Sequence, residues 1–113
     1  MIIEKEVIEY LESVMPDVPC FAERQTPDPD TFLIVEKTGS HITNRIETST
    51  VAVQSYGPTK LSAAELNELV KTNMENMVVR PDISAVYLNS DYPFTDTASK
   101  RYRYQAVFVI THY

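Results

Sequence analysis

Two segments of the chain repeat hydrophobic residues at the spacing of an amphipathic helix. In the first segment, glutamates occupy much of the surface between the apolar positions, and Pro16 and Pro19 end the predicted helix. Proline ends a helix because it lacks a backbone N–H donor and its ring clashes with the preceding turn. The apolar positions of this first helix are Ile3, Val7, Tyr10, Leu11 and Val14.

The second helical segment carries its own start and stop signals. Ser62 and Glu65 have the spacing of a capping box, in which the serine oxygen accepts the Glu65 N–H and the Glu65 side chain reaches back. Pro81 ends the predicted helix. One face of this helix carries Leu66, Leu69, Val70, Asn73, Met74 and Met77.

Five segments favour β-strands because they are rich in β-branched and aromatic residues. They are residues 20–25, 32–37, 46–56, 83–90 and 100–113. Composition predicts a turn at residues 26–30 and a polar loop at residues 38–45 around Gly39. Gly57 and Pro58 end the third predicted strand.

The last predicted strand shows clear alternation. Its connection to the preceding strand, residues 91–99, is long for a hairpin and contains two aromatic residues, Tyr92 and Phe94. Because of its large aromatics, one face is expected to pack against the helices: Tyr102, Tyr104, Ala106, Phe108 and Ile110. The opposite face carries Arg101, Arg103, Gln105, Val107, Val109 and Thr111.

The order of these elements predicts an α+β fold. The order is α-β-β-β-α-β-β within a single domain of residues 1–113, with a mainly antiparallel sheet and the two helices packed on one face. A length of 113 residues, 43% of them hydrophobic and 23% charged, suits one globular domain rather than a disordered chain.

Charge and composition argue against some classes of function. The net charge of −6 disfavours a partner rich in phosphate, such as nucleic acid. Residues 1–36 carry a net charge of −7 and residues 80–113 a net charge of +1, which favours head-to-tail self-association, although both regions also read as ordinary solvated surface. With only two glycines, the chain lacks both glycine-rich nucleotide-binding fingerprints.

We find no constellation of residues typical of catalysis, a metal site or a cofactor. Cys20 is the only cysteine, so no internal disulfide forms and a reducing compartment is expected. His41 and His112 are far apart in sequence, and Asp28 and Asp30 lie between prolines as turn formers. The chain shows neither a signal peptide nor a membrane span, which predicts a protein used in the cytoplasm.

One region resembles a known family. Residues 88–97 (LNSDYPFTDT) and 100–108 (KRYRYQAVF) resemble small neck and tail proteins of long-tailed bacteriophages and prophages. These proteins are often labelled minor capsid proteins and belong with the tail-terminator or tail-completion group, which joins tails to heads. The predicted element order is similar to theirs over nearly the whole chain.

This resemblance implies a structural protein and not an enzyme. It implies a ring, commonly a hexamer, at the head-proximal end of the tail, where the ring ends tube polymerisation and joins the tail to the head. The implied partners are copies of the chain, tail-tube proteins and head-connector proteins, with no membrane and only passive passage of DNA. Such a protein is made in the host bacterial cytoplasm and ends in the virion neck.

The expected interface combines the aromatic connection with nearby charges and the polar loop. Its residues are Tyr92, Phe94, Asp96, Arg101, Arg103, His41 and Arg45. Tyr92 and Phe94 fit equally well as interface anchors and as side chains folded back on the domain's own core. An alternative function is a small cytoplasmic α+β ligand-binding or regulatory domain that acts as a dimer.

Overall fold

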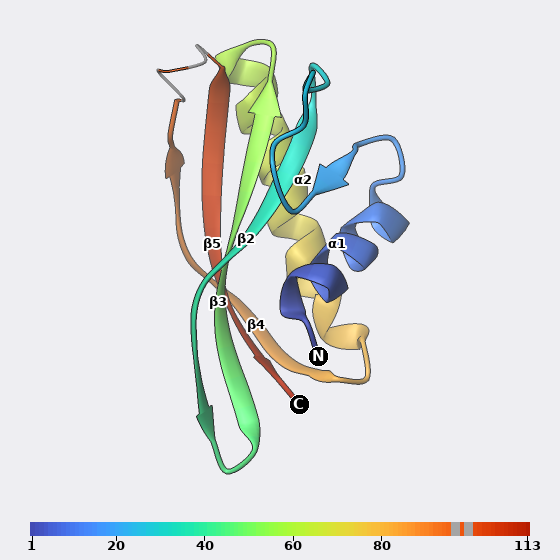
Figure 1. Ribbon diagram of the computed structural model, residues 1–113, viewed down its shortest axis with the longest axis vertical. Helices are drawn as coiled ribbons and strands as arrows, with labels where there is room; N and C mark the ends of the chain where they lie inside the picture. The colour runs from blue at the N-terminus through green and yellow to red at the C-terminus, as the bar shows by residue number, and fades with distance from the viewer. Residues whose placement is uncertain (96–97, 99–100) are drawn as a thin grey trace.

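A computed structural model, which describes residues 1–95, 98 and 101–113, confirms the α+β fold and the α-β-β-β-α-β-β order as one domain (Figure 1). The sheet has the order β1-β2-β3-β5-β4, with β1 parallel to β2 and the other pairings antiparallel. Its strands are β1 (Cys20–Phe21), β2 (Phe32–Thr43), β3 (Ile46–Gly57), β4 (Ile83–Pro93) and β5 (Tyr102–His112). The helices are α1 (Ile3–Val14), α2 (Lys60–Glu75) and a 3-10 turn, η1 (Asn76–Val79).

Both helices cover the same face of the sheet, and β3 lies at its centre (Figure 1). Every residue from Val51 to Gly57 is buried, because β3 has a neighbouring strand on each side and packed side chains on each face. The helices contribute their predicted apolar faces to the main core: Ile3, Val7, Tyr10 and Leu11 from α1, then Leu66, Val70 and Met74 from α2, and Met77 from η1. Val14 and Leu69 are exposed instead.

The predicted cap of the second helix is wrong by one turn. The helix begins at Lys60, and Thr59 is its N-cap. The Thr59 side chain accepts the Ser62 N–H at 3.0 Å, and the Ser62 hydroxyl accepts the Thr59 N–H at 3.1 Å. Ser62 therefore fills the position that a glutamate holds in the usual box, and Glu65 lies one turn inside the helix.

The predicted polar loop at residues 38–45 is also wrong. Strand β2 continues to Thr43, and a two-residue turn, Asn44 and Arg45, joins it to β3. Both turn residues have positive φ, 51° and 67°, as a type I′ hairpin turn requires. The sequence showed no alternation here because most of these side chains are exposed on both faces of the hairpin.

The last strand confirms most of the predicted alternation. Ala106, Phe108 and Ile110 are buried in the main core, whereas Tyr102 is 41% exposed and Tyr104 is half-buried. Tyr102 escapes burial because it pairs with Gly57 in the last rung of the β3–β5 ladder, where the sheet ends. Strand β4 runs to Pro93, so the connection to β5 is shorter than expected.

We expect the Gly57→Ala variant to lower the free energy of unfolding by about 1–3 kcal/mol, the usual scale for overpacking. A Cβ at this position would lie 2.5 Å from the Ser62 hydroxyl and 2.9 Å from the Ala63 backbone nitrogen, so the start of α2 must shift. Urea unfolding measures the change.

The matched control is Gly39→Ala. A Cβ there meets nothing within 4 Å, and Gly39 does not have positive φ. Its stability should be unchanged or slightly increased. Equal losses in the two variants would show that contact with α2 is not the cause.

Candidate interaction surfaces

The sheet face turned away from the helices carries aromatic and arginine side chains at one end. At the centre of this group of side chains, the buried rings of Phe32 and Tyr56 stack with centroids 4.4 Å apart and planes 8° apart. The two residues face each other across β2 and β3. We call the following set the arginine–aromatic cluster: Phe21, Arg24, Phe32, Tyr56, Tyr92, Phe94, Arg101 and Arg103.

Arg103 ties the segment after β4 to the centre of the sheet. Its guanidinium carbon lies 4.1 Å from the Phe94 ring centroid and 5.6 Å from that of Tyr56. Its Nε donates to the Phe94 carbonyl at 2.6 Å, and its Nη1 donates to the Tyr56 hydroxyl at 2.8 Å. The side chain is therefore held in one orientation by two hydrogen bonds and two ring contacts.

Arg24 and Arg101 approach the same stacked pair. The Arg24 guanidinium carbon lies 4.9 Å from the Tyr56 centroid, and that of Arg101 lies 5.4 Å from the Phe32 centroid. Arg24 forms an ion pair with Asp28, and its hydrogen bond is the main cause that holds the pKa of Asp28 below the ordinary value.

Arg101 bonds to backbone carbonyls, and its charge lies close enough to Asp28 to help lower the pKa of that carboxyl, after the larger effect of Arg24. Arg101 donates to the carbonyls of Pro29 and Asp30 at 3.0 and 2.8 Å. Within the described ranges, both Arg101 and Arg103 bond to uncharged oxygens rather than to carboxylates. Among the described residues, the three arginines of the cluster outnumber the one carboxylate that is ion-paired with them, Asp28, so this part of an acidic protein carries an excess of positive charge.

The structure brings together four of the seven predicted interface residues: Tyr92, Phe94, Arg101 and Arg103. Asp96 lies outside the described residues. His41 and Arg45 are not part of this cluster. They belong to the far end of the β2–β3 hairpin, whereas the cluster surrounds the Phe32–Tyr56 rung at its base (Figure 1).

Sequence reasoning missed Arg24, Phe32 and Tyr56. Phe32 and Tyr56 looked like ordinary strand residues, and only the register of β2 against β3 shows that their rings stack. The sequence did contain one signal for Phe32. Successive side chains of a strand point to opposite faces of the sheet, and Leu33 and Val35 face the helices, so the Phe32 ring must lie on the other face.

Tyr92 and Phe94 are half-exposed. The sequence left two roles open for them, as interface anchors or as side chains folded back on the core, and their exposure is intermediate between the two. Their exposed fractions are 39% and 44%, and their ring centroids are 6.0 Å apart. The Tyr92 hydroxyl accepts from the Gln105 side-chain amide at 2.6 Å, and the Gln54 side-chain amide donates to Oε1 of Gln105 at 2.9 Å. The rings are thus oriented by the domain but remain open to a partner.

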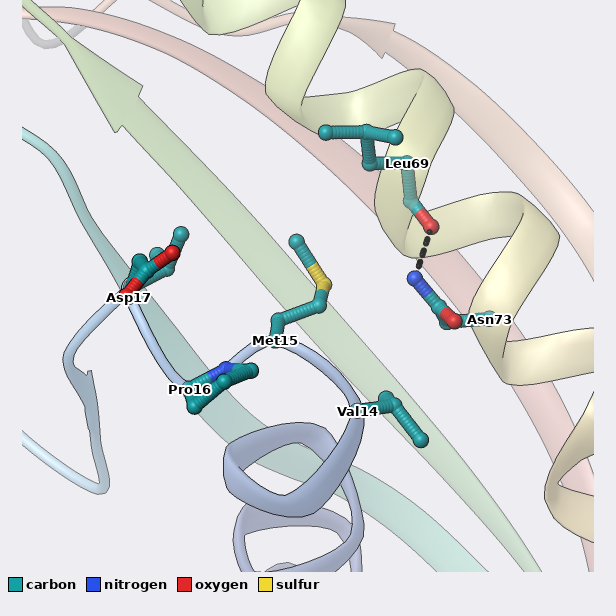
Figure 2. Close-up of a pocket in the computed structure, with 7 residues that line it drawn as sticks. Val14, Met15, Pro16, Asp17, Leu69 and Asn73 are labelled. Carbon is teal, nitrogen blue, oxygen red and sulfur yellow. Dashed lines mark hydrogen bonds between the residues drawn. The ribbon is translucent and has the colours of Figure 1, made fainter.

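A second surface lies on the helix side of the molecule, between the end of α1 and the middle of α2 (Figure 2). It is an open, mainly apolar hollow of about 370 Å³. Tyr10 joins the two helices beside it, since its hydroxyl donates to the Asn73 carbonyl at 2.6 Å. The residues lining the hollow are Val14, Met15, Pro16, Asp17, Val18, Leu69 and Asn73.

His112, Ser49 and Glu47 form a polar cluster between β3 and β5. The sequence indicated only that His112 lies on a strand. Its Nε2 lies 2.8 Å from the Ser49 hydroxyl and 3.7 Å from Glu47, and Ser49 also donates to Glu47 at 3.0 Å. This arrangement differs from a catalytic triad, in which histidine lies between serine and carboxylate through its two nitrogens. Here both partners approach the same nitrogen, and Ser49 is fully buried.

Cys20 does not offer a reactive thiol. The side chain is buried in the main core, and burial is the main cause that raises its pKa to about 12. A thiol with so high a pKa is almost entirely protonated at neutral pH and is a poor nucleophile.

Among residues 1–95, 98 and 101–113, no group of three or more His, Cys, Asp or Glu side chains is placed to hold a metal ion. No helix in those ranges has both the length and the apolar character needed to span a membrane.

Comparison with known proteins adds no assignment. No protein-family model matches the chain, and no curated protein matches it. The resemblance of residues 88–97 and 100–108 to bacteriophage neck proteins therefore stays a prediction.

We expect Glu47→Gln to lower the melting temperature at pH 7, with the difference from wild type shrinking as the pH falls below about 4.3, the ordinary pKa of a glutamate. Hydrogen bonds from Ser49 and Lys37 hold the pKa of Glu47 below its ordinary value. A carboxyl group lowered in this way stabilises the fold above its unfolded-state pKa and loses that contribution as the pH falls through its folded-state pKa.

Thermal melts monitored by circular dichroism from pH 3 to pH 8 measure this difference. Glu65→Gln, at an exposed position of α2, is the control and should leave the melting temperature nearly constant relative to wild type. A difference for Glu47→Gln that stays constant with pH would contradict the assignment.

We expect the double variant Tyr92→Ala/Phe94→Ala to lose no more than about 2 kcal/mol of stability, because both rings are half-exposed and their contacts are of the surface cation–π and hydrogen-bond kind. It should nevertheless no longer bind purified tail tubes, as measured by co-sedimentation of the folded variant with the tubes. Phe108→Ala, in the main core, should cost about 3–5 kcal/mol. A comparable loss in the double variant would assign Tyr92 and Phe94 to the core.

Proposed function

We propose that this chain is a structural subunit of the neck of a long-tailed bacteriophage or prophage. It forms a ring at the head-proximal end of the tail, ends polymerisation of the tail tube and joins the tail to the head. The ring binds and positions other virion proteins and catalyses no reaction. The proposal rests on the resemblance of residues 88–97 and 100–108 to neck and tail-completion proteins, together with the surfaces described above.

The observation that carries the proposal is the arginine–aromatic cluster. Tyrosine, phenylalanine and arginine are enriched at the centres of protein interfaces, where they supply most of the binding energy. Tyr92, Phe94, Arg101 and Arg103 all lie in the resembling segments, and ring stacking and backbone carbonyls hold the arginines in position. An interface made of oriented side chains loses little entropy on binding.

A ring also needs two unlike surfaces on each subunit. Contacts between identical patches give dimers, whereas contacts between different patches propagate and close into rings. The hollow between α1 and α2 is one such surface, and the arginine–aromatic cluster lies on the opposite face of the sheet, where it stays available to a different virion protein.

Charge fits a ring that DNA crosses without binding. The net charge of −6 repels phosphates over most of the surface, so DNA passes without being held. The cationic cluster is the exception, and its position among aromatic rings suits an acidic protein surface on a tail-tube or head-connector protein.

The alternative is a small ligand-binding or regulatory domain that acts as a dimer. One observation favours it: the hollow of about 370 Å³ falls within the range of roughly 300–1,000 Å³ typical of small-molecule sites. Its wide opening to solvent and its single ionisable lining residue, Asp17, favour a docking surface over an enclosed ligand site.

Electron microscopy and mass photometry of the concentrated protein, alone and mixed with purified tail tubes, test the proposal. We expect rings of about six subunits, with caps on one end of each tube and tubes that stop growing once capped. The folded Phe94→Ala variant should leave tubes uncapped. A stable dimer that never caps tubes would overturn the proposal and favour the alternative.

A further inference from the structure

We propose that subunits of the ring join by insertion of the tip of the β2–β3 hairpin of one copy into the hollow between α1 and α2 of the next copy. The hairpin tip comprises Ile42, Thr43, Asn44, Arg45 and Ile46. This inference rests on the proposed function and deepens it, because it names the contact that closes the ring.

The hairpin tip projects from the body of the molecule. The last rung that ties β3 to β5 is Glu47 with His112, and the tip continues beyond that rung at one end of the 43 Å long axis (Figure 1). Two isoleucines lie close to its turn: Ile46 follows the turn directly and Ile42 precedes it by one residue, and they are 39% and 68% exposed. Apolar side chains at the end of an otherwise polar hairpin gain from burial only against another molecule.

The hollow has the matching chemistry. Val14 and Leu69, which the helical periodicity assigned to the core, are 40% and 56% exposed and form part of its apolar lining (Figure 2). Met15, which is buried, also lines the hollow, and the Tyr10 hydroxyl joins the two helices beside it by its hydrogen bond to the Asn73 carbonyl. The hollow is therefore a preformed seat for a branched aliphatic side chain such as Ile42.

Charges on the two surfaces are complementary. Arg45 lies in the turn of the hairpin tip, and Asp17 lines the hollow beside the apolar residues. In the described portion of the chain, neither side chain forms an ion pair. An isoleucine entering the hollow with Arg45 beside it would bring the guanidinium to the rim that carries Asp17, so a second copy of the chain fits both the shape and the charge.

The backbone conformation of Arg45 also supports an interface role for the hairpin tip. Its φ of 67° lies in the left-handed region, where a type I′ turn strongly prefers glycine. A long cationic side chain at this position is locally unfavourable for the hairpin itself. Residues that break a local rule in this way are concentrated at functional sites.

Cross-linking between two cysteine variants tests the contact directly. Thr43→Cys places a thiol on the hairpin tip and Val14→Cys places one in the hollow, and the native Cys20 is buried and protonated. A short bis-maleimide should link the two variants when they are mixed, and neither variant alone. Thr43→Cys mixed with Asn89→Cys, on the exposed part of β4, is the control and should remain unlinked.

A charge swap in the same cysteine variants tests the proposed ion pair. Arg45→Glu alone, or Asp17→Arg alone, should lower the yield of cross-linked product by about tenfold, because each places like charges together. The two changes combined should restore the yield. Asp82→Arg, an exposed change at the η1–β4 turn, should have no effect.

Arg45→Gly separates assembly from folding. Glycine suits the positive φ, so the variant should melt at the wild-type temperature or above, yet its cross-linking should fall, though less than that of Arg45→Glu, because glycine removes the attraction to Asp17 without adding repulsion. A purely structural role for Arg45 would not lower cross-linking in a variant of equal or greater stability.

The outcomes keep this inference distinct from the proposed function. Capped tubes without cross-linking between positions 43 and 14 would overturn the hairpin contact and leave the ring proposal standing. Cross-linking with charge-swap rescue, but without tube capping, would support the contact and contradict the neck function. Equal cross-linking in the control mixture would show that the reaction is non-specific and would also overturn the contact.

Discussion

The close approach of α2 to β3 at Gly57 is the constraint on which the rest of the structure depends. Because Gly57 has no side chain, the chain reverses at once and α2 begins three residues later, capped by Thr59 and Ser62. This junction places Leu66, Val70 and Met74 over the central strands and leaves the opposite sheet face free of helices. The distribution of covered and uncovered surface therefore follows from one position without a side chain.

The two faces of the sheet are stabilised in different ways. On the helix side, aliphatic side chains from every main element share one core. On the other side, a stacked phenylalanine–tyrosine pair is surrounded by guanidinium groups, which pack on the rings while their N–H groups bond to protein oxygens. The second arrangement completes a fold that has only one helix layer, and it also leaves charged and aromatic groups oriented at the surface.

The sequence predicted those features that depend on local periodicity. The faces of both helices and the alternation of Ala106, Phe108 and Ile110 follow from burial on one side only. The hairpin at residues 38–45 escaped prediction because a strand with solvent on both faces has no hydrophobic alternation. The arginine–aromatic cluster escaped it for another reason: Arg24, Phe32 and Tyr56 meet through strand register and a long-range turn, which a linear sequence does not encode locally.

Because Cys20 is buried, its thiol can report on local unfolding of the N-terminal part of the domain. The thiol lies on the edge strand β1, next to Leu33 of β2, and packs against the residues that hold α1 in place. Modification by a thiol reagent requires this edge of the sheet to separate first, so the rate of modification measures how often α1 and β1 detach from the folded domain. The natural sequence therefore allows the local unfolding of α1 and β1 to be measured without introducing a label.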